Sequence, residues 1–121
     1  MRLYTPPATL VLHLNRFAGG AGGKFARLRK NGAAVAVPDR LDVAPFCNAA
    51  GLAAAGGRGV YELVAVCEHS GGMGGGHYTA TGRTAGDGRW YHFNDESVAR
   101  AECPARASSA AYVLFYRAAA R

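Results

Sequence analysis

Paired cysteines, long apolar runs and long helical patterns are missing from this sequence, and each absence excludes a class of protein. Its 121 residues include three cysteines, Cys47, Cys67 and Cys103, with no Cys-x-x-Cys pair. That odd count argues against a disulfide framework or a zinc knuckle and fits a reducing compartment. No apolar run approaches the roughly 18 residues that a spanning helix needs, and residues 1–7 lack the apolar core of a signal peptide. We therefore expect a soluble protein of the cytoplasm or nucleus, with no membrane partner, metal site or cofactor.

The net charge of +6 raises the question of nucleic-acid binding. The main cluster of basic residues lies within residues 24–30, where Phe25 and Leu28 alternate with the charged side chains. A nucleic-acid binder usually shows a longer basic stripe with stacking aromatic residues on one face. We interpret the cluster as a solvated loop or an edge strand whose charges resist edge-to-edge pairing, and we expect no nucleic-acid partner.

Short strands account for most of the remaining pattern. Period-two alternation in residues 9–17 places Leu10, Leu12 and Leu14 on one face. The strongest strand pattern, residues 60–69, places the alternate residues from Tyr61 to His69 on one face. Further strands are expected at residues 35–37, 41–43, 77–83, 89–94 and 111–116, with a brief continuation from Val98. Half of the residues are hydrophobic, which is enough for one folded domain, residues 1–121. The short strands predict that this domain is built mainly as an antiparallel sheet.

The segments between these strands carry glycine, alanine and proline. Residues 19–23 and 70–76 are glycine-rich and are expected to form loops. Residues 48–59, rich in alanine and glycine, are interpreted as a surface insertion with a helical turn. A second helical turn is expected within residues 104–109.

The chemically informative stretch runs from Gly75-Gly76-His77-Tyr78 to Trp90-Tyr91-His92-Phe93-Asn94-Asp95. A cysteine protease needs an imidazole to hold a thiolate, and a third polar group to fix the orientation of that imidazole. Asparagine or aspartate can do this by accepting the second ring N–H. His77 lies 17 positions before Asn94, on strands joined by a short turn. Singly, the histidine is more often structural, and the Asn-Asp pair more often an Asx turn.

The turn between these strands leaves two registers open. A turn centred on Ala85-Gly86 places His77 directly opposite Asn94. The stronger turn signal, Asp87-Gly88, pairs Asn94 with Thr81 and leaves His77 about 13 Å away along the strand. In that case a longer loop or a bulge is needed to bring the two side chains together.

In combination, these segments resemble the ubiquitin-specific proteases, which are papain-like cysteine deubiquitinases. The resemblance runs from about Pro7 to Arg117, in the right order throughout. Gly75-Gly76-His77-Tyr78-Thr79-Ala80 is similar to the family's histidine box, and residues 90–98 to the box with the third catalytic residue. Three further segments match family strands: residues 10–17, residues 61–66 with His69-Ser70-Gly71, and residues 111–117.

The resemblance implies an α+β papain-like fold, of which this chain would form mainly the antiparallel palm. It implies a thiol-dependent hydrolase that cleaves after the C-terminal glycine of ubiquitin, with His77 as general base and Asn94 and Asp95 as its orienting residues. Residues 70–76 match a loop that borders the ubiquitin tail, where glycines would let backbone groups come close. The substrate-binding residues expected on this basis are Ser70, Gly75, Gly76 and Tyr78.

The family's cysteine box has no counterpart here. Such a nucleophile lies at a helix N-terminus, after an asparagine or glutamine that completes the oxyanion hole. Cys47, Cys67 and Cys103 lack that context, so each is interpreted as an inert thiol. We therefore expect the chain alone to be inactive and its partners to be ubiquitin and a separate cysteine-bearing lobe. The alternative is a non-catalytic module that binds ubiquitin or serves as a scaffold.

Overall fold

The computed structural model describes residues 2–19, 28–71 and 75–119 as a sheet-rich chain with one short α-helix in these ranges. Its elements in chain order are β1 (Thr9–His13), β2 (Phe17–Gly19), β3 (Leu28–Lys30), β4 (Val35–Ala36), β5 (Arg40–Asp42), the 3-10 helix η2 (Ala44–Phe46), α1 (Ala49–Ala54), β6 (Val60–Ser70), β7 (His77–Arg83), β8 (Trp90–Asn94), β9 (Ser97–Ala101), β10 (Ala107–Ser108) and β11 (Ala111–Ala118). No helix in these ranges is long and apolar enough to cross a membrane.

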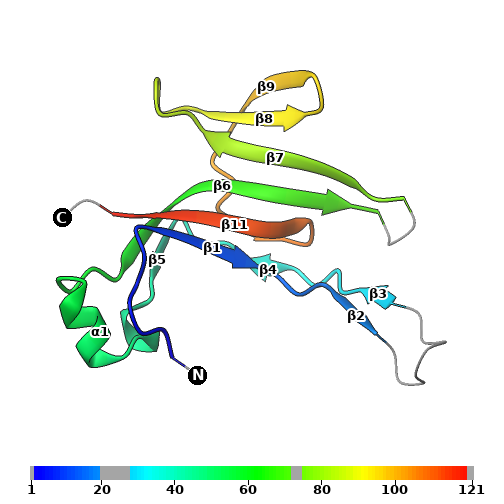
Figure 1. The fold of residues 1–121 in the computed structure, drawn as a ribbon. Helices are drawn as coiled ribbons and strands as arrows, with labels where there is room; N and C mark the ends of the chain where they lie inside the picture. The colour runs from blue at the N-terminus through cyan, green and yellow to red at the C-terminus, as the bar shows by residue number, and fades with distance from the viewer. Residues whose placement is uncertain (1, 20–27, 72–74, 120–121) are drawn as a thin grey trace.

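The main sheet is antiparallel and follows the order β1-β11-β6-β7-β8-β9 (Figure 1). The last strand of the chain therefore lies between β1 and β6, as Leu10↔Tyr116 and Leu114↔Val66 show. Strand β5 pairs with the first residues of β6, whereas β7 pairs with its second half. The long strand β6 thus links the packed end of the sheet to the β7–β9 meander, which carries the candidate site.

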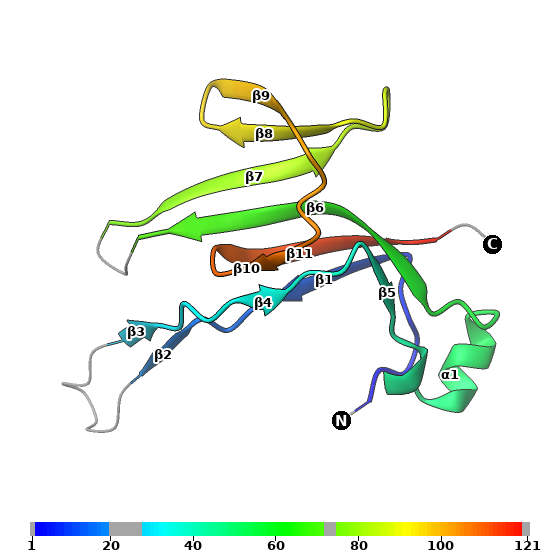
Figure 2. The ribbon, with the colours of Figure 1, turned by 180° about the vertical axis from the view of Figure 1, so that it is seen from behind.

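The core packs against one face of the sheet at the β5 end. Tyr61, Leu63 and Tyr116 are fully buried there, and Val37, Val43 and Cys47 cover them from the segment that includes β4, β5 and η2. Figure 2 shows this segment together with α1 on the far side of the sheet from Figure 1. The helix begins at Asn48, whose side chain accepts hydrogen bonds from the backbone N–H groups of Ala50 and Gly51.

A β-bulge in β6 corrects the expected alternation of that strand. Leu63 pairs with Tyr116 and Ala65 with Phe115, so Val64 has no partner on β11. The extra residue exchanges the two faces, because side chains alternate strictly along an unbulged strand. Beyond the bulge Val66 is buried, while Ala65 and Cys67 are half-buried on the other face. The prediction of one continuous face from Tyr61 to His69 was therefore wrong after Leu63.

Two further expectations need correction. The strand predicted over residues 9–17 is divided into β1 and β2, although Leu10 and Leu12 do share a face toward the core. The helical turn predicted within residues 104–109 was wrong. Ala107 and Ser108 instead pair with Ala36 and Val35, so tertiary pairing overrides the weak local preference. The predicted loop at 19–23 lies outside the described residues except for Gly19, which ends β2.

A buried arginine ties the connections at one end of the sheet together. Arg16 is 3% exposed. It donates from Nε to the carbonyl of Ala111 at 2.6 Å, and from its two terminal nitrogens to the carbonyls of Asn31, Ala33 and Ser108 at 2.8–3.0 Å. The forked guanidinium suits this task because it presents several donors in one plane. It fixes β2 and the segment after β3 against the start of β11.

Candidate active site

His77 is the first residue of β7 and follows the glycine-rich connection from β6. It pairs in the sheet with Ser70, the last residue of β6, so its backbone lies at the loop end of the β6–β7 hairpin. About half of its side-chain surface is exposed. A histidine at a strand end is held by few backbone contacts. Its orientation therefore depends on side-chain neighbours.

Asn94, the last residue of β8, provides the hydrogen bond that orients this histidine. Its Oδ1 lies 2.7 Å from Nε2 of His77. The paired residues of β7 and β8 include Ala80↔Phe93 and Thr81↔His92, and this register continues to place Asn94 across from Thr79. His77 is thus the diagonal neighbour of Asn94 on the same face. Diagonal neighbours in a sheet are within reach of long side chains.

Both registers considered from the sequence were wrong. The observed pairing lies between them, because the turn takes up four residues, 85–88, between Thr84 and Arg89. Asp87 stabilises this loop by accepting hydrogen bonds from the backbone N–H of Arg89 and the hydroxyls of Thr84 and Tyr91. Gly88 completes the turn with φ +68°, a conformation that favours glycine. The side chains of His77 and Asn94 close the remaining offset without a bulge.

Asp95 lies in the two-residue loop between β8 and β9, where Asn94 pairs with Ser97. Its φ of 51° is in the left-handed region, which aspartate tolerates better than most residues. Its Oδ2 lies 3.9 Å from Nε2 of His77. That distance suits an ion pair with a protonated imidazole rather than a hydrogen bond, so Asn94 is the residue that directly orients the ring.

The four residues predicted to bind substrate lie close to His77, but they differ in exposure and in the space around them. Ser70 lies opposite His77, and Tyr78 is 53% exposed beside it. A side chain at Gly75 would meet nothing within 4 Å, whereas a Cβ at Gly76 would lie 1.9 Å from Nε2 of His69. The catalytic and substrate-binding roles stay predictions. The geometry does bring all seven residues to one end of the sheet.

Sequence reasoning did not foresee an aromatic cluster on the face opposite the ring of His77. His69, Tyr78 and Tyr112 have ring centroids 4.7–6.0 Å apart, and Phe17 packs edge-on against His69 at 5.4 Å. His69 is 4% exposed, and its Nδ1 has no hydrogen-bond partner within the described ranges. Burial, followed by the nearby charge of Lys30, lowers the pKa of His69 and favours its neutral form. A second bulge, at Tyr112, brings distant segments together here, so no local pattern predicted the cluster.

A polar network beside Asn94 was also missed. The Thr81 hydroxyl donates to Oε1 of Glu68 at 2.9 Å and lies 3.0 Å from Nδ1 of His92. The hydroxyl has a single hydrogen, so its bond to Glu68 requires Nδ1 of His92 to be the donor. The alternation of residues 77–81 and 90–94, together with the register, is the signal that places these side chains on the same face as His77.

None of the three cysteines lies where a thiol could meet His77. Cys47 precedes α1, which Figure 1 shows at the other end of the sheet from the β6–β7 connection. Its thiol is buried and donates to the carbonyl of Val43 at 3.2 Å. Cys67 pairs with Ala80 on the face opposite His77, and burial raises its pKa. Burial is also the main cause of the raised pKa of Cys103, which lies near Asp39.

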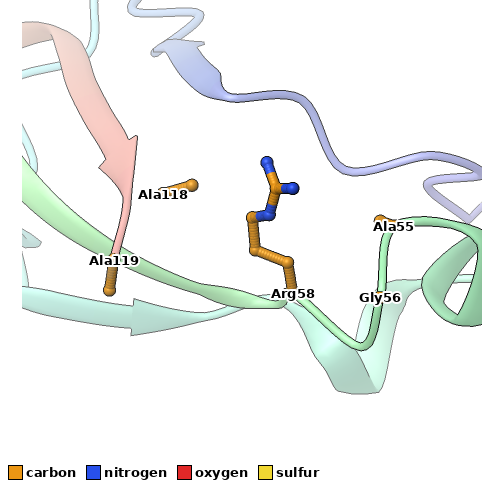
Figure 3. Close-up of a pocket in the computed structure, with 5 residues that line it drawn as sticks. All are labelled: Ala55, Gly56, Arg58, Ala118 and Ala119. Carbon is orange, nitrogen blue, oxygen red and sulfur yellow. The ribbon is translucent and has the colours of Figure 1, made fainter. Parts of the chain in front are cut away.

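A hollow of about 390 Å³ lies away from this site (Figure 3). It is lined by Arg58, with Ala55 and Gly56 on one side and Ala118 and Ala119 on the other. It contains none of the residues predicted to act on a substrate. Across the described ranges, no group of three or more histidine, cysteine, aspartate or glutamate residues could hold a metal ion.

Comparison with known proteins gives concordant results. The model of the family described as ubiquitin carboxyl-terminal hydrolase matches residues 1–116. Ubiquitin carboxyl-terminal hydrolase 15 from Homo sapiens is 39% identical over 118 residues, which cover 95% of this chain and 11% of that protein. Ubiquitin carboxyl-terminal hydrolase 10 from Arabidopsis thaliana is also 39% identical over 118 residues, with 95% and 12% coverage.

Solved structures agree with the sequence relatives. A chain of the yeast SAGA DUB module has a TM-score of 0.76 and 28% identity, over 94% of this chain and 24% of its own length. A chain of the SAGA DUB module bound to ubiquitin aldehyde has a TM-score of 0.74 and 28% identity, with 94% and 25% coverage. These neighbours have the papain-like fold, so the predicted fold class is confirmed. This chain spans about a tenth of the curated relatives and about a quarter of the solved chains.

Proposed function

The chain belongs to the ubiquitin carboxyl-terminal hydrolase family, and from this membership we propose that it is the histidine-bearing part of a cysteine-type deubiquitinase. Residues 1–121 would form the C-terminal part of the catalytic domain. The single observation that carries the proposal is the 2.7 Å hydrogen bond between Nε2 of His77 and Oδ1 of Asn94. Three free cysteines favour the cytoplasm or nucleus as its compartment.

The hydrogen bond determines which ring nitrogen is available for chemistry. The Oδ1 of an asparagine side chain can only accept, so Nε2 of His77 carries a hydrogen and donates it. In the neutral ring, Nδ1 is then the free base. Asn94 therefore leaves Nδ1 to take a proton from a thiol, while Asp95 stabilises the imidazolium that forms.

The proposed reaction uses this base twice. Nδ1 of His77 takes the thiol proton, and the thiolate attacks the carbonyl carbon of the last glycine of ubiquitin. The tetrahedral intermediate collapses as Nδ1–H protonates the leaving amine of the substrate lysine. Water then attacks the thioester with His77 again as base, which releases ubiquitin with a free carboxylate and restores the thiol.

The nucleophile of this scheme comes from outside residues 1–121. Cys47 and Cys67 are placed where they cannot meet Nδ1 of His77, and the raised pKa values of Cys67 and Cys103 oppose thiolate formation. The proposed partners are a cysteine-bearing lobe and ubiquitin. Ser70, Gly75, Gly76 and Tyr78 are proposed to border the ubiquitin tail, and the open space at Gly75 supports a close approach of substrate backbone.

A chimeric enzyme tests the proposal. This chain replaces the matching segment of ubiquitin carboxyl-terminal hydrolase 15 from Homo sapiens, and hydrolysis of a fluorogenic C-terminal ubiquitin conjugate is measured. We expect turnover by the chimera and none by the chain alone. His77→Ala should lower kcat/KM at least about 10²-fold, the usual contribution of a general base. His13→Ala, an exposed histidine on β1, is the matched control and should retain turnover.

Two outcomes would contradict the proposal. If the His77→Ala chimera turns over as fast as the unchanged chimera, His77 is not the base. If the isolated chain is active and a change of Cys47, Cys67 or Cys103 abolishes the activity, the nucleophile lies within the chain. A folded chimera that binds ubiquitin without turnover would favour the non-catalytic alternative.

A further inference from the structure

The buried ring of His69 lies directly against the backbone of Gly76. A Cβ added at Gly76 would lie 1.9 Å from Nε2 of His69 and 2.5 Å from its Cε1. Real Cβ atoms do not approach a ring so closely, so position 76 has no room for any side chain. The backbone at Gly76 does not itself require glycine, because the glycines with positive φ in the described ranges are Gly56, Gly57, Gly71 and Gly88. The glycine is therefore needed for the contact with His69.

The same ring also packs on the other neighbour of His77. The His69 and Tyr78 ring centroids are 4.7 Å apart with an interplanar angle of 57°, and these two residues are direct partners in the β6–β7 ladder. One side chain thus contacts the residues immediately before and after His77. It does so from the face opposite the His77 ring, because neighbouring side chains of a strand point to opposite faces.

His69 is held firmly enough to serve as a support. Its backbone N–H donates to the carbonyl of Ala110 at 2.8 Å. Its own carbonyl accepts from Nζ of Lys30 at 2.9 Å, and the same ammonium donates to the carbonyl of Gly71 at 3.1 Å. Phe17 and Tyr112 pack around the ring. The packing of these rings holds His69 in place, and its Nδ1 has no hydrogen-bond partner in the described part of the chain.

We propose that His69 is a positioning residue that holds the backbone on both sides of His77, so that the imidazole of His77 stays in register with Asn94. The effect of this positioning on catalysis rests on the proposed function, in which His77 is the general base. The need for such a support follows from the position of His77, which begins a strand and occupies the last pair of the β6–β7 ladder. Strand ends open more readily than strand centres, and a displacement of about 1 Å at a catalytic group can cost about 10²-fold in rate.

Four variants of the isotopically labelled chain test the geometry by NMR. The readout is the NOE between the ring protons of His77 and the side-chain amide of Asn94. Cross-strand NOEs between Ala80 and Phe93 report that the sheet is intact. We expect His69→Ala and Gly76→Ala each to lose the His77–Asn94 NOE while the Ala80–Phe93 NOEs remain. His69→Phe, which keeps a ring of similar size, should retain the NOE, and so should the control Phe46→Ala, a change at an exposed aromatic residue of η2.

A double variant separates a local clash between residues 69 and 76 from a general loss of folding in either single variant. Gly76→Ala clashes with the ring, and His69→Ala removes that ring. The pair His69→Ala/Gly76→Ala should therefore recover part of the NOE that Gly76→Ala loses, a non-additive result expected for residues in contact. The proposal is overturned if His69→Ala keeps the NOE, if His69→Phe loses it, or if the double variant recovers none of it.

The kinetic meaning is measured separately in the chimeric hydrolase. We expect His69→Ala to lower kcat by up to about 10²-fold, the cost of a misplaced catalytic group, with little change in KM. Loss of the NOE together with an unchanged kcat would overturn the positioning role. Lack of turnover by the unchanged chimera would instead contradict the proposed function and leave the NMR result standing.

Discussion

His77 and Asn94 meet across the β7–β8 hairpin although they are two residues out of direct register. Their side chains close this offset with a hydrogen bond of 2.7 Å between Nε2 and Oδ1. The contact depends on the four-residue turn after Thr84, because a turn shorter or longer by two residues would move Asn94 relative to His77. The position of the turn and the orientation of the proposed base are therefore linked.

The first prediction concerns the acceptor itself. Asn94→Leu keeps the shape of the side chain and removes its oxygen, so His77 should lose its preferred ring orientation. Asn94→Asp keeps an acceptor and should retain the contact. NOEs from the His77 ring to the side chain at position 94 check both variants. Equal ring orientation in Asn94→Leu and the unchanged chain would show that Asn94 does not orient the histidine.

The second prediction concerns the network of Glu68, Thr81 and His92. Thr81 is 5% exposed, and its hydroxyl contacts both other members. Thr81→Val preserves the shape but leaves two partly buried polar groups without this partner, which should cost about 1–3 kcal/mol. Urea unfolding measures the change. Thr79→Val, on the same face of β7, is the control and should change stability by less than about 0.5 kcal/mol.

The third prediction concerns the buried guanidinium of Arg16. Lysine cannot reach four backbone carbonyls at once, so Arg16→Lys leaves some of them unpaired. We expect a loss of at least about 2 kcal/mol in the free energy of unfolding, measured by denaturant titration. Arg58→Lys, an exposed change of the same kind, should have little effect. A loss of the same size in both variants would exclude the clamp as the cause.

The fourth prediction concerns pH and Asp87. Hydrogen bonds from Thr84, then Tyr91 and the backbone of Arg89, lower the pKa of this carboxyl well below its usual range. When folding lowers the pKa of a carboxyl, the ionised carboxylate stabilises the folded chain at pH values above the pKa of the unfolded chain, about 3.9 for aspartate. This stability is lost as the pH falls toward the lower pKa of the folded chain. The Tm advantage of the unchanged chain over Asp87→Asn should therefore be largest near pH 6 and shrink below about pH 4. An advantage that stays constant with pH would contradict the assignment.

The fifth prediction concerns pH and His69, and its sign follows from the same linkage. Burial lowers the pKa of this histidine, so the unfolded chain binds a proton more readily than the folded chain. The corresponding stability is present above the unfolded pKa of about 6.5 and is lost as the pH falls below it. Acidification from pH 7.5 should therefore destabilise the unchanged chain more than His69→Phe. Parallel Tm curves for the two proteins would show that His69 is not held neutral by the fold.

The sequence alone was enough to predict the family and the fold class, and it named the candidate site residues that the structure brings to one end of the sheet. Alternating apolar residues specified most strands, because burial of one face imposes a period of two. The glycines before His77 and the aromatic run before Asn94 marked the two boxes as a local pattern. Tertiary structure was not needed for these inferences, since each depends on neighbours within about ten residues.

Only the tertiary structure decided how these pieces meet. The register of β7 against β8 depends on the hydrogen bonds of Asp87 in the turn, and two different turns were compatible with the sequence. The bulge at Val64, which exchanges the faces of β6, lies in the pairing of that strand with β11. The contact of His69 with Gly76 depends on the packing of Phe17 and Tyr112 around the ring. The last two of these features are set by residues far apart in the chain, whose mutual approach no local pattern encodes.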